Sequence, residues 1–488
     1  MSLFAIVFLA SFVFLGVVPV VAGLYQYLLL PFSAFATHLE KADAFLPRVS
    51  VLIPAWNEGA VLGTTIERLL ALDYPSDRLR IFVVDDASTD DTPAVVIEKA
   101  KLYPGRVQHV RRVSGGEGKA HTLNYGLDVL WQSTWTEAVL IMDADVVYTR
   151  DSLRKMARHL ADAEVGAVTA YIKEGSRRPN WLQRCVTFEY ITATGASRRA
   201  QNVLGFLVCL SGGAQLHSRA NLQSLGGRIF SETLAEDTFT TFLSQLGGRR
   251  VLFEPNAVVY AEEPDSLLGL WKQRLRWARG NVQISGEFRR LWLRPEEHRK
   301  LGSLSFSLLW FSIFLMPLFQ VSTAASLIAL FFLDAALAWT CFRLLWILSG
   351  VVYLVVTLCS FVVDFESAAK SWREGILFPG LVSLAVISYS FAPGIVDLPV
   401  VRDGVTQLTP YNTATTLFLY GWVAGSMLVA FLALLLEQRG RLAPLSPWVL
   451  HLGGYGAFLC AVTFGAYVEE LRGAERTWDK TEKTGKVV

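Results

Sequence analysis

Two pairs of carboxylates stand directly after apolar runs. Asp85 and Asp86 follow IFVV, and Asp143 and Asp145 follow AVLIM. Carboxylate oxygens suit Mg²⁺ and Mn²⁺, and such an ion neutralises the charge of a diphosphate leaving group. We therefore predict a divalent-cation and diphosphate site at Asp143 and Asp145. Acidic residues also end strands in ordinary loops, so a single Asp-x-Asp motif is weak evidence by itself.

A third acidic pair, Glu236 and Asp237, lies in the segment LAEDTF. Transfer of a group to a hydroxyl needs a general base within hydrogen-bond reach of that hydroxyl, and Asp237 is a candidate for this role. The competing interpretation is an N-terminal helix cap, in which Ser231 or Thr233 pairs with the acidic residues that follow.

A basic and aromatic segment, LWKQRLRWARG, contains Gln273, Arg276 and Trp277. Arginine binds phosphate groups with several donors, and the face of a tryptophan packs on apolar faces of ligands such as sugars. These residues are therefore candidates for substrate binding. The segment equally fits an interfacial anchor, with tryptophan and arginine at the depth of the lipid headgroups.

Weaker signals accompany these motifs. The turn after the first apolar strand contains Pro54, Asn57 and Glu58, which we predict to face a nucleotide. Lys119 follows a glycine and is predicted to place its ammonium on a phosphate or a base. The small residues 211–214 (SGGA) allow a polymer to approach the backbone closely. Each of these segments also fits an ordinary turn.

The region 38–300 reads as the domain that positions these residues. Strands are predicted at 50–55, 81–88 and 138–145, and a helix is predicted near 58–72. Strands that alternate with helices indicate a parallel, doubly wound α/β sheet, which binds ligands at the carboxyl ends of its strands. Both aspartate pairs fall at such ends.

The whole chain of 488 residues is 52% hydrophobic and has a mean hydropathy of +0.37. Its apolar residues are concentrated outside the region 38–300. Runs of about 20 apolar residues are typical of membrane-spanning helices. We predict one such helix within 1–37, retained rather than cleaved, and a multi-helix region at 301–467. The apolar stretches of the second region are 303–341, 344–363, 375–392, 414–436 and 446–467.

Charge places the parts on either side of the predicted membrane. Lys41 and Arg48 follow the first apolar run, so the positive-inside rule places residue 40 onward in the cytoplasm. We favour a cytoplasmic location for the polar tail 468–488 and expect a multi-pass protein of the cell membrane. The number of crossings is left open, because either 303–341 crosses twice, with a break near Pro317, or one of the stretches lies in the interface without crossing.

The remaining composition excludes several classes. The net charge of +2 favours neither nucleic acid nor an acidic partner. The five cysteines are scattered without a CxxC pair, so we expect small buried apolar residues rather than disulfides or a zinc site.

Taken together, PAWNE, VVDDAS, GKAHTLNYGL, MDADVV, LAEDT and QRLRW occur in an order that resembles the processive family-2 glycosyltransferases. These include cellulose, hyaluronan, chitin-oligosaccharide and poly-N-acetylglucosamine synthases. The resemblance covers roughly residues 48–285 and the flanking apolar helices. It implies a GT-A-like domain that binds a nucleotide-sugar and is inserted between transmembrane helices of a polytopic protein.

The resemblance also implies residue roles. Asp86 contacts the nucleoside, Asp143 and Asp145 bind diphosphate and metal, and Asp237 is the base. The metal is expected to be Mg²⁺ or Mn²⁺.

The family's gating and acceptor motif corresponds to Gln273, Arg276 and Trp277, and the membrane helices correspond to a translocation channel. The base motif reads AED where cellulose and poly-N-acetylglucosamine synthases commonly have TED. His121 stands where a small residue is common.

We therefore predict an inverting, processive enzyme that polymerises a β-linked polysaccharide from a UDP-sugar, with UDP-N-acetylglucosamine favoured by overall similarity. A glycolipid glycosyltransferase that acts on a membrane lipid is the alternative. A transporter with a nucleotide-sensing domain fits less well, because a sensor needs no general base. An export or accessory protein is left open.

Overall fold

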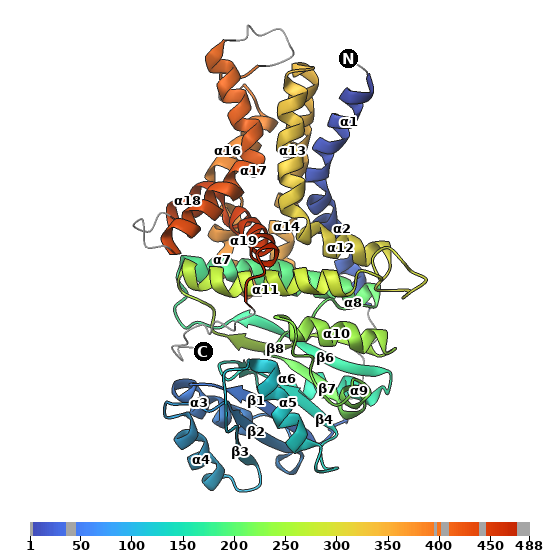
Figure 1. Ribbon diagram of the computed structural model, residues 1–488, viewed down its shortest axis with the longest axis vertical. Helices are drawn as coiled ribbons and strands as arrows, with labels where there is room; N and C mark the ends of the chain where they lie inside the picture. The colour runs from blue at the N-terminus through green and yellow to red at the C-terminus, as the bar shows by residue number, and fades with distance from the viewer. Residues whose placement is uncertain (1–2, 36–44, 395–397, 402–408, 439–445, 476–488) are drawn as a thin grey trace. The chain divides into compact units, whose positions relative to one another are not determined.

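The computed structural model describes residues 3–35, 45–394, 398–401, 409–438 and 446–475 (Figure 1). Its contacts divide the chain into two compact units. The helical unit comprises Met1–Leu28, Ser266–Val282 and Leu304–Ala474, and the sheet unit comprises Leu29–Asp265, Gln283–Ser303 and Glu475–Val488. Lys41 and most of the predicted tail 468–488 lie outside the described residues.

The sheet unit is built on a sheet with the strand order β3-β2-β1-β4-β7-β6-β8-β5 among the described residues. The strands are β1 (Val49–Ala55), β2 (Leu79–Asp85), β3 (Val107–Arg111), β4 (Ala138–Ile141), β5 (Val147–Tyr148), β6 (Val165–Glu174), β7 (Gln215–Ser218) and β8 (Arg250–Ala261). The three strands predicted from the sequence are β1, β2 and β4.

The sheet is mixed rather than wholly parallel. Strands β1 to β4 run parallel, as predicted, but β7 is antiparallel to both β4 and β6, and β5 is antiparallel to β8. The prediction of a parallel, doubly wound sheet is therefore wrong at β7 and β5, whereas β6 and β8 again pair in parallel. The strand that breaks the pattern, QLHS, contains Gln215 and His217, which are polar yet buried. Hydropathy does not mark such a strand, because its burial depends on hydrogen bonds within the fold.

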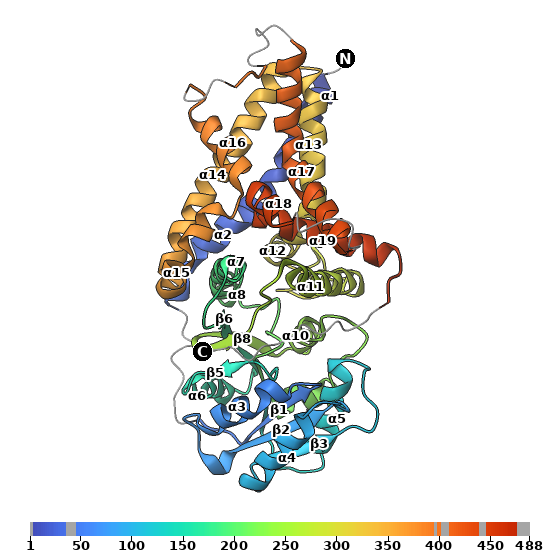
Figure 2. The same cartoon turned by 90° about the vertical axis from the view of Figure 1, so that its left-hand side faces the viewer.

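Helices cover both faces of the parallel half (Figure 2). Val51 and Ile53 of β1 pack with α3 (Gly59–Leu70) and α4 (Thr92–Leu102), whereas Leu52 packs with α5 (Lys119–Leu130). Successive side chains of a strand point to opposite faces, so one apolar run serves both layers. The further helices of the sheet unit are α6 (Ser152–Ala157), α7 (Trp181–Glu189), a π-helix (Tyr190–Ala196), α8 (Ser197–Leu204), α9 (Arg219–Ser224) and α10 (Glu236–Leu246).

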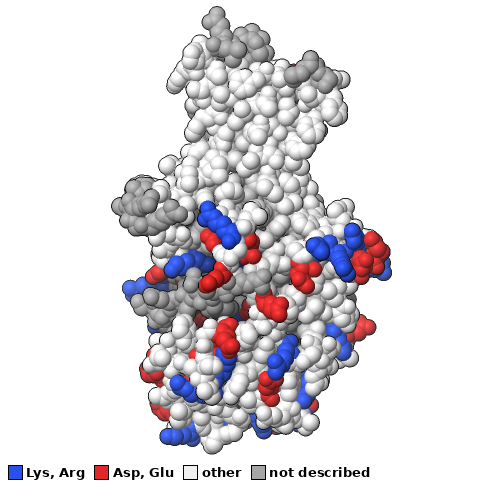
Figure 3. Space-filling view, in the orientation of Figure 1, with Lys and Arg blue, Asp and Glu red and all other residues white. Residues whose placement is uncertain are grey.

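The helical unit contains segments long and apolar enough to cross a membrane. Three are continuous among the described residues: Leu3–Ser33, Ala335–Val363 and Pro410–Gln438. Three bent pairs pass the same test when each is counted as one span: Leu304–Phe314 with Met316–Phe331, Phe365–Leu377 with Leu381–Phe391, and Pro447–Gly453 with Tyr455–Leu471. Helices α12 (Leu304–Phe314) and α13 (Met316–Phe331) meet at a bend of 71° next to Pro317. The break that one of the two alternatives placed near Pro317 is therefore present, whereas the number of crossings stays a prediction. Charged side chains are sparse on the face of these helices in Figure 3.

Two of the bends each contain a glycine, and the two glycines lie against each other. Helices α15 (Phe365–Leu377) and α16 (Leu381–Phe391) break at Gly380, and α18 (Ser446–Gly453) and α19 (Tyr455–Leu471) break at Gly454. Both glycines have positive φ, 84° and 92°, which other residues rarely adopt. A Cβ on Gly380 would lie 2.4 Å from the nitrogen of Gly454, so the close approach of the two backbones also requires glycine.

Candidate active site

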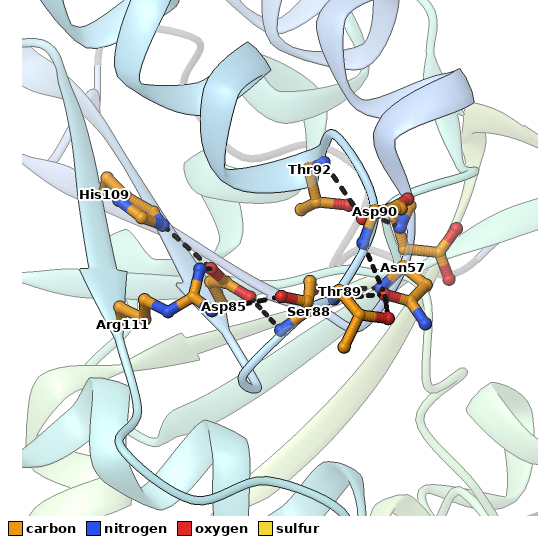
Figure 4. Close-up of polar contacts among 9 residues, drawn as sticks. Asn57, Asp85, Ser88, Thr89, Asp90, Thr92, His109 and Arg111 are labelled. Atoms are coloured by element: carbon orange, nitrogen blue, oxygen red, sulfur yellow. Dashed lines mark hydrogen bonds and ion pairs between the residues drawn. The ribbon is translucent and has the colours of Figure 1, made fainter.

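The carboxyl ends of β1 and β2 are joined by the turn that contains Asn57 (Figure 4). Asn57 has a φ of 56°, and its Oδ1 accepts hydrogen bonds from the backbone N–H groups of Thr89 (2.8 Å) and Asp90 (3.3 Å). The backbone N–H of Glu58 donates to Thr92 Oγ1 at 2.8 Å. Asn57, predicted to bind substrate, thus also fixes two loops to each other. Pro54, the residue before the end of β1, is half-buried and lies in register with Val84 of β2.

Asp85 is enclosed by the protein. Its carboxylate accepts hydrogen bonds from Arg111 Nη1 (2.9 Å) and Ser88 N–H (2.8 Å) and lies 3.1 Å from His109 Nε2 (Figure 4). The side chain is fully buried. Asp85 therefore holds the end of β2 in place.

Asp86 is surrounded by the loop that follows β3. Its Oδ1 pairs with Arg112, which also pairs with Glu117, and its Oδ2 accepts a hydrogen bond from Gly116 N–H at 3.0 Å. Gly115 lies so close that a Cβ there would collide with the backbone oxygen of Asp86. The predicted nucleoside residue is therefore fixed by a glycine-rich loop and by an arginine that the sequence reading did not single out.

Lys119, the first residue of α5, lies among the acidic residues. Its Nζ is 2.5 Å from Asp143 Oδ1 and 3.7 Å from Glu236 Oε1, and it donates to the backbone oxygen of Gly212 at 3.1 Å. Burial by itself lowers the pKa of Lys119, but attraction to Asp143 and Glu236 outweighs burial and raises that pKa above its usual value. Lys119 is therefore a firmly charged ammonium.

Asp237 lies in the same cluster, in the first turn of α10. A Cβ on Gly212 would lie 3.2 Å from both Asp237 Oδ2 and Lys119 Nζ, so the SGGA backbone passes directly by both groups. Asp237 Oδ1 accepts a hydrogen bond from Thr238 N–H at 2.6 Å. The helix-cap interpretation of this motif is wrong, because the N-cap residue Ala235 makes no side-chain capping bond.

Behind this cluster lies Arg198, at the start of α8. Its Nη1 donates to Ser211 Oγ at 2.5 Å, and it interacts electrostatically with Asp237. Burial lowers the pKa of Arg198. The π-helix Tyr190–Ala196 directly precedes Arg198, and π-helical turns are frequent at functional sites. No sequence motif marks this residue, because its relevance depends on the long-range contact with Ser211.

Asp143 and Asp145 by themselves supply only part of the ligands that a divalent cation needs. Asp143 and Asp145 follow β4 in one short turn, and the side chain of Asp143 is 40% exposed. Among the described residues, no group of three or more His, Cys, Asp or Glu side chains is arranged to hold a metal. Mg²⁺ characteristically takes one or two carboxylates and completes its shell with substrate phosphates and water, so these two aspartates suit such an ion.

The QRLRW segment lies in helix α11 (Leu267–Glu287), in the part that belongs to the helical unit. Trp271 packs against Gly465 of α19, and Arg279 Nε donates to Glu470 Oε1 at 2.6 Å. These two contacts fix the helix to α19. They involve residues beside the predicted motif rather than the motif itself.

Of the motif residues, Gln273 is buried and accepts a hydrogen bond from Arg274 Nη1 at 2.7 Å. The guanidinium of Arg274 lies 4.2 Å from the ring centre of Trp277, a residue that is 39% exposed. Arg276 is half-buried.

The cysteine prediction of small buried residues holds for Cys185, Cys341 and Cys460, whereas Cys209 and Cys359 are half-buried. All five lie within the described residues and are free thiols there.

Comparison with known proteins identifies the domain. Residues 47–280 match the family described as "Glycosyltransferase like family 2". The chain contains a family 2 glycosyltransferase domain.

Curated relatives of the glycosyltransferase domain have different products in their names. Beta-monoglucosyldiacylglycerol synthase of Synechocystis sp. is 32% identical over 238 residues, which is 49% of this chain and 48% of that protein. Poly-beta-1,6-N-acetyl-D-glucosamine synthase of Staphylococcus epidermidis is 27% identical over 237 residues, which is 48% of this chain and 55% of that protein. The chain thus spans about half the length of these relatives.

A solved structure supports the fold of the glycosyltransferase domain and its surroundings. A mannosyltransferase from Pyrobaculum calidifontis, in complex with GDP-Man and Mn²⁺, superposes with a TM-score of 0.50 and 22% identity. The match covers 78% of this chain and 99% of the other. The predicted GT-A-like fold is confirmed at this level, with a mixed sheet.

Proposed function

We propose that the chain is a membrane-embedded, inverting and processive glycosyltransferase. It polymerises a β-linked polysaccharide from a UDP-sugar, with UDP-N-acetylglucosamine as the favoured donor. The observation that carries the proposal is the cluster of Lys119, Asp143 and Asp237 around the backbone of Gly212. This cluster combines a diphosphate-side carboxylate, a fixed cation and a base next to a strip of backbone without side chains.

The proposed chemistry is a single displacement. Asp237 accepts the proton of the acceptor hydroxyl while the oxygen attacks the anomeric carbon of the donor. The bond to the nucleoside diphosphate breaks on the opposite face, which inverts the α-linked donor to a β-linkage. Lys119 offsets the charge of the surrounding carboxylates, and Arg276 is assigned to the departing diphosphate.

Asp143 and Asp145 are assigned to Mg²⁺ or Mn²⁺, which neutralises the diphosphate when bound. The Mn²⁺ in the related mannosyltransferase complex supports this assignment. Asp86, Asn57, Glu58 and Pro54 are assigned to the nucleoside side of the donor, in the loops that Figure 4 partly shows.

The membrane part of the proposal rests on the apolar helices. We assign the glycosyltransferase domain to the cytoplasmic side of the cell membrane, where nucleotide-sugars are made, and the helices to translocation of the product. Gln273 and Trp277 are assigned to the acceptor. Their helix, α11, is fixed to α19 through Trp271 and Arg279, which supports a link between elongation and the membrane helices.

A glycolipid glycosyltransferase is the second candidate. The Synechocystis relative, at 32% identity, is named for a glycolipid product, whereas the staphylococcal relative at 27% is named for a polymer. A lipid acceptor needs the same donor site and base. The two functions differ in the acceptor, a membrane lipid or the growing chain, and in whether the product remains the next acceptor.

The deciding experiment is turnover by the purified full chain in detergent with Mg²⁺ or Mn²⁺. UDP-N-acetylglucosamine, UDP-glucose and UDP-glucuronate are tested separately, with and without diacylglycerol, and the radiolabelled product is sized. A long polymer from one donor supports the synthase. A product of one or two sugars that depends on diacylglycerol assigns the chain to glycolipid synthesis. A folded protein that binds UDP yet transfers no sugar argues against both functions for the isolated chain.

A further inference from the structure

A glutamine side chain, Gln283, makes hydrogen bonds to the loop before the proposed base. Gln283 Oε1 accepts hydrogen bonds from Leu234 N–H at 3.0 Å and from Thr233 Oγ1 at 3.2 Å. Thr233 Oγ1 in turn accepts one from Ala235 N–H at 3.2 Å. A backbone N–H only donates, so the atom that faces Leu234 must be the carbonyl oxygen of the amide. These bonds connect Gln283 to the residue directly before Glu236.

The first turn of α10 has no side-chain cap to orient it. Ala235 is the N-cap residue, with φ −130° and ψ 64°. The first N–H groups of a helix have no partner within the helix, so the direction of the turn depends on what holds the preceding loop. Here the loop is held by Gln283, which lies 50 residues after Thr233 in the sequence. The side chain of Asp237 projects from this same turn.

Gln283 is itself held firmly. Five residues later, Phe288 packs against Phe239 and Phe242 of α10, with ring centres 5.0 and 4.9 Å apart. Trp292 meets Phe242 edge-on at 6.1 Å. Aromatic pairs at these separations favour a defined geometry. The segment that begins at Gln283 is therefore fixed along α10, and the amide has little freedom to leave the loop.

We propose that Gln283 is a positioning residue, which sets the direction of Asp237 through Thr233 and Leu234. Gln283 lies near the end of α11, in the part of that helix that belongs to the sheet unit. Its hydrogen bonds therefore connect this end of the helix to the turn of the base. This inference rests on the proposed role of Asp237, and it adds that the base is aligned by a residue outside α10.

The test uses the full chain and two matched pairs of variants. Gln283→Met keeps the length of the side chain but removes the acceptor oxygen, whereas Gln283→Glu keeps an acceptor. Thr233→Val removes the hydroxyl at nearly constant shape, whereas Thr233→Ser keeps it. Gln223→Met, on the exposed side of α9, controls for the loss of a glutamine.

We expect Gln283→Met and Thr233→Val to lower kcat about 10- to 100-fold, because small displacements of a reacting group are costly. The donor KM and the Kd for UDP should stay within about twofold, because the donor site is formed by other loops. Thr233→Ser and Gln283→Glu should recover most of the kcat, and Gln223→Met should match the wild type.

Equal loss of kcat in Thr233→Ser and Thr233→Val, or a kcat for Gln283→Met at the wild-type value, overturns the inference. If Gln283→Met does not fold, the threonine pair decides the question by itself. A wild-type protein that turns over no donor is a different outcome, because it overturns the proposed function rather than the role of Gln283.

Discussion

The ammonium of Lys119 lies 2.5 Å from Asp143 Oδ1, and Glu236 and Asp237 act on it electrostatically. A buried cation between carboxylates allows these groups to stay ionised side by side, because each charge is offset by its neighbour. From its sequence context, Lys119 was predicted to contact a phosphate or the nucleotide base. The structure places it between the residue proposed for the metal and the turn of the proposed base.

Lys119→Met should therefore impair both folding and catalysis. Removal of one partner from a buried ion pair costs about 3 kcal/mol, and we expect turnover to fall by about 100-fold. Thermal unfolding and steady-state turnover measure the two effects. Lys370→Met removes an exposed i,i+4 pair with Glu366 and should change neither. Wild-type turnover in Lys119→Met would exclude Lys119 from the site.

Asp237→Asn should fold and bind UDP but lose roughly 100- to 10,000-fold in turnover, because an amide cannot accept the proton of the acceptor. Isothermal titration with UDP and a transfer assay separate binding from chemistry. A matched substitution, Glu236→Gln, should reduce turnover less if Asp237 is the base. The reverse order would assign the base to Glu236.

Gly212→Ala should lower kcat about 10-fold with an intact fold. The added Cβ would lie 3.2 Å from both Asp237 Oδ2 and Lys119 Nζ, so one of these groups must shift. Gly286→Ala is the control, since a Cβ there meets nothing within 4 Å. The expected result is a lower kcat with an unchanged melting temperature. An unaffected kcat would show that no reacting group depends on the close approach of the Gly212 backbone to Asp237 and Lys119.

Asn57→Ala should weaken donor binding. The substitution removes two hydrogen bonds to the 89–90 backbone, at about 1 kcal/mol each, and places alanine at a φ of 56°. Asn57→Asp keeps the acceptor oxygen and should retain most of the affinity for UDP, whereas Asn57→Gly relieves the backbone but not the lost bonds. Titration with UDP ranks the three. Equal affinity of Asn57→Ala and the wild type contradicts the role of this side chain.

Glu174 should make the stability of the sheet unit depend on pH. Burial, together with the charges of Glu263 and Glu262, raises the pKa of Glu174 from 4.5 to about 7, although hydrogen bonds from Ser176 oppose the rise. The folded state thus holds a proton that the unfolded chain releases between pH 4.5 and about 7. Stability from this group is fully present below pH 4.5 and decreases as pH rises through 7, by roughly 3 kcal/mol.

Thermal unfolding at pH 5.5 and pH 8 measures this effect. Glu174→Gln stays neutral at both values and should be more stable than the wild type at pH 8. Its melting temperature should also change less between the two conditions. A wild-type and a variant with the same pH dependence would contradict the assigned cause.

Much of the parallel half of the fold was readable from the sequence because local signals agreed. Apolar runs that end in aspartates marked β1, β2 and β4, and their carboxyl ends do lie at one edge. The antiparallel β7 was not readable, because His217 and Gln215 are buried through hydrogen bonds to each other and to Asn221. Similarly, Thr233 looked like a helix cap, whereas its hydroxyl bonds to Gln283 and Ala235.

The sequence by itself determined the types and order of the groups at the candidate site: the aspartates, Lys119 and the glycines of SGGA. It did so because strand ends, turns and glycine-rich segments are set by residues close together in the chain. Only the tertiary structure decided which of these groups face one another. The contact of Lys119 with Asp143, of Arg198 with Ser211 and of Gln283 with Leu234 each depends on how separate elements pack. Packing is a property of the whole sheet and its helices, and no local pattern encodes it.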